Sequence, residues 1–280
     1  MAFSNLFLIS CRATSMLFVL ALGLLFELES FPFRAVFVGL LFSHFAMGFY
    51  YSKANLLAMK EKKFALLIAS VLLIIGLFFA IEKPYLAPYF LIFHAALSDA
   101  YLLKMKAPES GKEETLALIR TVFYASCGSV GFIQMPETLR LIIVVIGVVS
   151  LVPLVIYTKD KTTLSLFEFP LIAVVGFTLF DGKPLHFHYM GFYHIMTWYV
   201  FSFWMLFVKE GNPIKTVKFF SQIAAYSVIF ILLFNYIFEY NITDKSFLKI
   251  IGTWSILHIF STIPLSKFNP SSIKRLFYVR

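Results

Sequence analysis

The sequence contains little charge and almost no cysteine. Asp, Glu, Lys and Arg make up only 14% of its 280 residues, whereas 60% are hydrophobic. Soluble globular domains carry about 25% charged residues, and a soluble fold cannot keep this much apolar surface out of water. The composition therefore excludes a secreted domain, a cytosolic enzyme, a disordered tail and a nucleic-acid-binding module. Two cysteines form no disulfide framework. We expect the solvent of this protein to be lipid.

No long linker, low-complexity tract or obvious internal repeat divides the chain. Apolar segments near the roughly 20 residues that a spanning helix needs follow one another at short intervals. The ten candidate segments are 13–28, 33–51, 64–81, 85–103, 115–134, 139–157, 163–180, 187–208, 217–237 and 247–265. This pattern predicts an all-α, polytopic transmembrane helix bundle of about ten spans, in which residues 1–280 form a single domain.

The basic residues alternate along the chain. Of the 24 Lys and Arg residues, 17 fall in the terminal regions and every second connection, and Arg120 lies inside a span. The intervening connections hold only six, which are Arg34, Lys83, Arg140, Lys183, Lys245 and Lys249. Cytoplasmic loops are rich in Lys and Arg, so the net charge of +9 indicates topology rather than nucleic-acid binding. It predicts a multi-pass protein of the cell (inner) membrane with both termini in the cytoplasm.

Histidine is absent from the odd-numbered segments. His44, His94, His194 and His258 each lie about seven to eleven residues into an even-numbered segment, and these segments all run in the same direction. At about 1.5 Å per residue, their depths differ by only about 6 Å. Intramembrane polar residues usually have a function, and neutral imidazole suits iron, zinc or copper. The four residues therefore predict a shared metal site, and separate interhelical hydrogen bonds are the alternative.

The remaining two histidines, His186 and His188, stand at the outer end of the eighth segment. This position is typical of interfacial residues. His188 would replace His194 as a metal ligand if the helix began deeper in the bilayer than expected.

The histidine segments resemble those of a known family. They are Phe93-His94-Ala95-Ala96-Leu97-Ser98-Asp99, His44-Phe45-Ala46-Met47-Gly48, Gly191-Phe192-Tyr193-His194 and Ile256-Leu257-His258-Ile259. Their order and spacing are similar to the Brp/Blh family of membrane β-carotene 15,15′-dioxygenases, which make retinal. The resemblance implies an Fe(II)-dependent carotenoid dioxygenase whose iron ligands are His44, His94, His194 and His258. Its partners would be dioxygen, a lipophilic substrate and the bilayer.

The chain departs from the family pattern at two positions. Trp198 stands where the family usually has a second histidine, one turn after the first, and Gly48 stands where it tends to have Asp. The metal site is therefore expected to be retained with a different substrate, or to have lapsed.

Three further residues are candidates for the catalytic chemistry. Tyr101 follows His94 by seven residues and shares its helix face. Asp99 lies nearer the cytoplasmic end, where it would orient a ligand or be solvated. Glu168 would hydrogen-bond to a ligand histidine or lie near the cytoplasmic end of its span. Arg120 would pair with Asp99 or extend to an interface.

Other classes of membrane protein fit less well. A retinylidene receptor needs a lysine in mid-span, and di-iron desaturases use clustered His-x-x-His pairs, neither of which is present. A transporter is typically built from broken helices and inverted repeats, and no repeat is visible. A transporter or a scaffold without catalysis is the alternative to the oxygenase.

Overall fold

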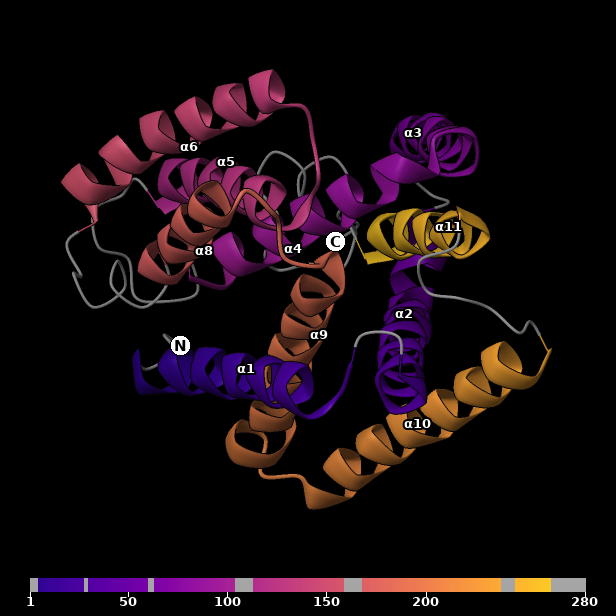
Figure 1. The fold of residues 1–280 in the computed structure, drawn as a ribbon. Helices are drawn as coiled ribbons and strands as arrows, with labels where there is room; N and C mark the ends of the chain where they lie inside the picture. The colour runs from indigo at the N-terminus through magenta and orange to yellow at the C-terminus, as the bar shows by residue number, and fades with distance from the viewer. Residues whose placement is uncertain are drawn as a thin grey trace. The chain divides into compact units, whose positions relative to one another are not determined.

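The computed structural model describes residues 5–27, 30–59, 63–103, 113–158, 168–237 and 245–262, and this part of the chain is all-α without a strand (Figure 1). Its α-helices are α1 (Asn5–Leu25), α2 (Phe31–Met59), α3 (Lys63–Glu82), α4 (Ala87–Leu103), α5 (Glu113–Phe132), α6 (Glu137–Tyr157), α8 (Phe169–Asp181), α9 (Phe187–Phe203), α10 (Pro213–Leu232) and α11 (Lys245–Thr262). The 3-10 turn η1 (Pro84–Leu86) precedes α4, and the π-helical turns η3 (Trp204–Lys209) and η4 (Leu233–Ile237) extend α9 and α10. Each predicted apolar segment coincides with one of these helices, which confirms the all-α fold class.

Five of the described helical segments are long and apolar enough to cross a membrane. They are Phe31–Tyr51, Glu113–Phe132, Glu137–Tyr157, Phe187–Lys209 and Pro213–Asn235, and a bent pair, Leu66–Glu82 with Pro84–Ala100, makes six if it is one span. The 13 residues of α8 extend only about 20 Å, less than the roughly 30 Å of a hydrocarbon core. The described part of the chain is therefore consistent with a membrane protein, and five to six of its helical segments are suited to span the bilayer.

The outer face of α6 carries large apolar side chains with little protein around them. Leu141, Val149 and Ile156 are each 64–65% exposed. Such a continuous apolar surface is unfavourable in water and favourable against acyl chains. The exposure of α6 therefore supports a lipid surrounding.

The described helices belong to two compact units. Unit 1 contains Pro88–Met190, with most of α4 and all of α5, α6 and α8. Unit 2 contains Cys11–Ala87 and the described part of Gly191–Leu265, with α2, α3, α10 and α11 and most of α1 and α9.

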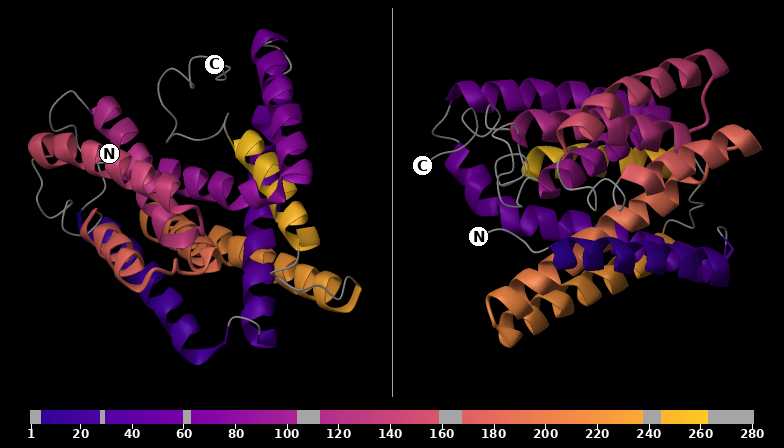
Figure 2. Two further views of the ribbon diagram at one scale, coloured as in Figure 1. Left: turned by 45° about the horizontal axis from the view of Figure 1, so that its top comes forward. Right: turned by 90° about the vertical axis from the view of Figure 1, so that its left-hand side faces the viewer.

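In unit 1, α5 packs against both α6 and α8, and both views of Figure 2 show α5 and α6 side by side. Two glycines allow the close approach of neighbouring helices. A Cβ atom on Gly131 would lie 2.6 Å from Cγ1 of Val174 in α8, and one on Gly128 would lie 2.8 Å from Cγ2 of Ile92 in α4. Small residues are common at such contacts because lipid provides no hydrophobic force between helices, and association depends on close packing.

In unit 2, α2 packs against α10 and α11, and α11 also packs against α3 (Figure 1). The ring of Phe42 in α2 stacks on Phe234 with centroids 4.6 Å apart. A hydrogen bond of 3.1 Å from the hydroxyl of Ser227 in α10 to the carbonyl oxygen of Gly39 joins the same two helices. These contacts hold α2 among its neighbours, and α2 carries the first of the predicted histidines.

We predict that Gly131→Ala destabilises unit 1. The side chain of Val174 is β-branched and stiff, so relieving the 2.6 Å approach requires α5 and α8 to move apart, at a cost of about 1–3 kcal/mol. Gly176→Ala in α8 is the matched control, because its new Cβ would meet no atom within 4 Å. Thermal unfolding in detergent measures both variants. Equal melting temperatures for the two would contradict the close α5–α8 packing.

Candidate metal site

Three of the four predicted histidines come together in unit 2. His44 lies on α2, His194 on α9 and His258 on α11, and each is at most 5% exposed. The ring centroid of His44 is 4.6 Å from that of His258 and 5.4 Å from that of His194. His44 is therefore the shared neighbour of two imidazoles that are distant from it in the sequence.

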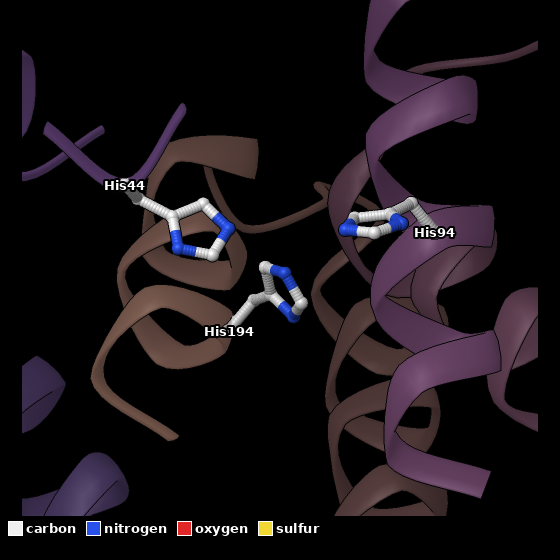
Figure 3. Close-up of side chains that lie close together, drawn as sticks. All are labelled: His44, His94 and His194. Carbon is white, nitrogen blue, oxygen red and sulfur yellow. The ribbon is translucent and has the colours of Figure 1, made fainter. Parts of the chain in front are cut away.

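The separation of the His44 ring from each of the other two rings is compatible with a pair of ligands on one metal ion. With metal–nitrogen distances of about 2.0–2.1 Å, two imidazoles on one ion have centroids roughly 4.5–6.5 Å apart, and both measured centroid distances fall in this range. A ring nitrogen of His44 and one of His194 lie within 4.8 Å of each other, against at most about 4.2 Å for two nitrogens on one ion. Figure 3 shows these two imidazoles close together.

Aromatic side chains surround His44. The indole of Trp198 lies 4.7 Å from its ring at an interplanar angle of 80°. Phe45 lies 6.1 Å from His44 and 5.2 Å from His258, and Tyr199 lies 6.4 Å from His44. These rings pack around His44 and help to bury it. Trp198, which the sequence marks as a departure from the family pattern, therefore contacts the site directly.

Hydroxyl groups connect α9 to its neighbours beside the histidines. The hydroxyls of Tyr199 and Ser43 are 2.7 Å apart, which joins α9 to α2. The hydroxyl of Thr197 donates to that of Ser15 at 3.0 Å, which joins α9 to α1. Neither pair was predicted. The sequence signal for Ser43, Thr197 and Tyr199 is a hydroxyl group within five residues of a histidine in an apolar segment, and this signal does not identify the partner helix.

The fourth predicted ligand, His94, belongs to α4 in unit 1 and is partly buried. Its side chain is labelled in Figure 3. Its role as a ligand stays a prediction. Of the two histidines expected at the interface, His186 is exposed, whereas His188 is buried and its ring lies 4.0 Å from that of Phe187. His194, rather than His188, is the residue whose ring contacts His44.

The three candidate catalytic residues have different surroundings. Asp99 is 8% exposed on α4, so it is buried rather than solvated. Tyr101 lies on α4, but its side chain is outside the described residues. Glu168 is 1% exposed at the start of α8.

Glu168 takes part in a buried polar network of unit 1. Its Oε1 atom accepts hydrogen bonds of 3.1 Å from Nε of Arg120 and from the hydroxyl of Tyr124, both on α5. The Nη2 atom of Arg120 donates to Oγ1 of Thr158 at 2.8 Å. Arg120 thus pairs with Glu168, and neither alternative expected from the sequence describes it. An intramembrane charge is tolerated when it is paired in this way.

No protein-family model, curated protein or solved structure matches this chain. A function is therefore inferred from its residues and their geometry.

We predict that Glu168→Gln destabilises the protein strongly. The substitution leaves the buried guanidinium of Arg120 without its counter-charge, and breaking a buried ion pair costs about 3–5 kcal/mol. The double variant Arg120→Gln with Glu168→Gln should recover much of this loss, because no uncompensated charge remains. Glu210→Gln is the surface control. It removes the exposed ion pair of 3.1 Å with Lys215 and should cost at most about 1 kcal/mol. Unfolding temperatures that fall equally for Glu168→Gln and Glu210→Gln would show that the buried ion pair stabilises the protein no more than the exposed one.

Proposed function

We propose that the histidines of unit 2 bind an iron ion and that the chain is a membrane-embedded oxygenase acting on a lipophilic substrate. The observation that carries the proposal is the contact of the His44 ring with both His194 and His258. The three histidines lie on three helices, and each is at most 5% exposed. One metal ion can bind several imidazoles at once, and neutral imidazole suits iron.

We propose His94 as the fourth ligand. Its support comes from the sequence, which predicts for His94 a depth similar to that of the other three. An ion held by three or four neutral imidazoles keeps its full charge and can retain an open position for a small molecule such as dioxygen.

The proposed substrate enters from the bilayer. The rings of Trp198, Phe45 and Tyr199 suit a polyene or a long acyl chain, and the resemblance to the Brp/Blh family makes carotenoid cleavage to retinal-type aldehydes the first choice. Bound Fe(II) would supply the dioxygen chemistry. We propose that Asp99 orients a ligand and that Tyr101 lies on the same helix face as His94. For Glu168, the bonds to Arg120 and Tyr124 favour a structural role.

A transporter is the second candidate: if Leu66–Glu82 and Pro84–Ala100 form one span rather than two, that span is a broken helix. Transporters bind their substrates at discontinuous helices. This alternative, or a scaffold role, predicts a protein that purifies without stoichiometric metal.

We predict that the purified protein contains about one iron per chain and that His44→Ala lowers this to background. His44 contacts both other imidazoles, so its loss should be more severe than that of His194 or His258. His186→Ala is the matched control, because His186 is exposed just before α9. Metal analysis and size-exclusion chromatography in detergent measure binding and folding. Loss of pigment in cells that accumulate β-carotene tests the substrate, and unchanged pigment with iron bound would indicate another lipid. Equal metal in the wild type and His44→Ala would reject the site.

We also propose ten spans, both termini in the cytoplasm and a location in the cell (inner) membrane. With the C-terminus in the cytoplasm, a fluorescent protein fused after Arg280 should fluoresce, and alkaline phosphatase fused at the same position should be inactive. The opposite result is expected for fusions after Gly182, which lies in a connection with few basic residues. An active phosphatase at Arg280 would overturn the topology.

A further inference from the structure

Tyr199 lies at the junction of the two helices that carry His44 and His194. Its hydroxyl is 2.7 Å from Oγ of Ser43 and 3.1 Å from the carbonyl oxygen of Leu40, and Ser43 Oγ is itself 3.0 Å from that carbonyl oxygen. One hydroxyl donates to the carbonyl and the other donates to its neighbouring hydroxyl. The two hydroxyl protons therefore link the oxygen atoms of Tyr199, Ser43 and Leu40 into one hydrogen-bonded group.

This group is buried and next to the histidines. Ser43 is completely buried and Tyr199 is 5% exposed. Ser43 directly precedes His44 in α2, and Tyr199 follows His194 by five residues in α9. Because hydrocarbon offers no competing partner, the bond fixes the relative height and rotation of the two helices at the level of the imidazoles.

We propose that Tyr199 is a positioning residue for the metal site, a role that rests on the proposed function. Its bond to Ser43 and Leu40 keeps the imidazole of His44 beside that of His194. Groups that orient metal ligands typically change affinity by 10- to 100-fold when they are removed. Tyr199 acts on the helix that carries the ligand rather than on the imidazole itself, so we expect an effect of about tenfold.

The test compares variants at this junction by titration with Co(II), whose visible absorption bands report the geometry of its ligands. Tyr199→Phe keeps the ring and removes the hydroxyl. It should weaken cobalt binding about tenfold and shift the absorption bands. Ser43→Ala should give a smaller loss, because Tyr199 keeps its bond to the Leu40 carbonyl. Thr197→Val is the matched control, because it removes an interhelical hydroxyl bond of α9 that goes to α1 instead of α2.

The outcomes separate the two proposals. If the wild type binds cobalt no better than His44→Ala, the proposed metal site is rejected, and the positioning role of Tyr199 is rejected as well. If the wild type binds and Tyr199→Phe has the same affinity and spectrum, only the positioning role is overturned. An equal loss in Thr197→Val also overturns it, because general loosening of α9 would then be the cause. Should Tyr199→Phe fail to fold, Ser43→Ala decides: unchanged cobalt affinity and bands reject the proposal, and a weaker, shifted complex supports it.

Discussion

A polar side chain inside a bilayer has to find its partner within the protein, because hydrocarbon offers neither donors nor acceptors. The helices of this chain are almost entirely apolar, so their few polar groups select which helices become neighbours. In unit 2, the pair of Tyr199 and Ser43 joins α9 to α2. In unit 1, the guanidinium of Arg120 joins α5 to Glu168 at the start of α8. Apolar side chains then fill the space that these contacts define.

The same constraint explains how much of the fold could be predicted from the sequence. A spanning helix satisfies its own backbone and depends mainly on continuous apolarity, so hydropathy located a helix at each predicted segment. The ends were less predictable, because hydropathy does not detect local stereochemistry. Among the described residues, α8 begins at Phe169 with Pro170 in its first turn and ends at Gly182, whose φ is +73°. Proline is favoured at such a start and glycine at such an end, whereas residues 163–167 of the predicted segment lie outside the described residues.

The sequence assigns the histidines similar depths but does not identify which of their helices are adjacent. Counting residues from the start of each segment gave similar depths for the histidines, since the rise of a helix is constant. Which helices touch depends on side-chain contacts between segments far apart in the chain. The sequence alone therefore could not place His44 between His194 and His258, nor choose Glu168 over Asp99 as the partner of Arg120. It also could not identify Tyr199 as a partner of Ser43, because isolated hydroxyl residues are common in apolar helices.

The contacts of Arg120 also have a consequence for how unit 1 is held together. Its guanidinium bonds to Thr158, where α6 ends, and to Glu168, where α8 is about to begin. Thr158 and Glu168 are therefore both anchored to α5. A single side chain consequently holds the end of α6 and the start of α8 to the same helix.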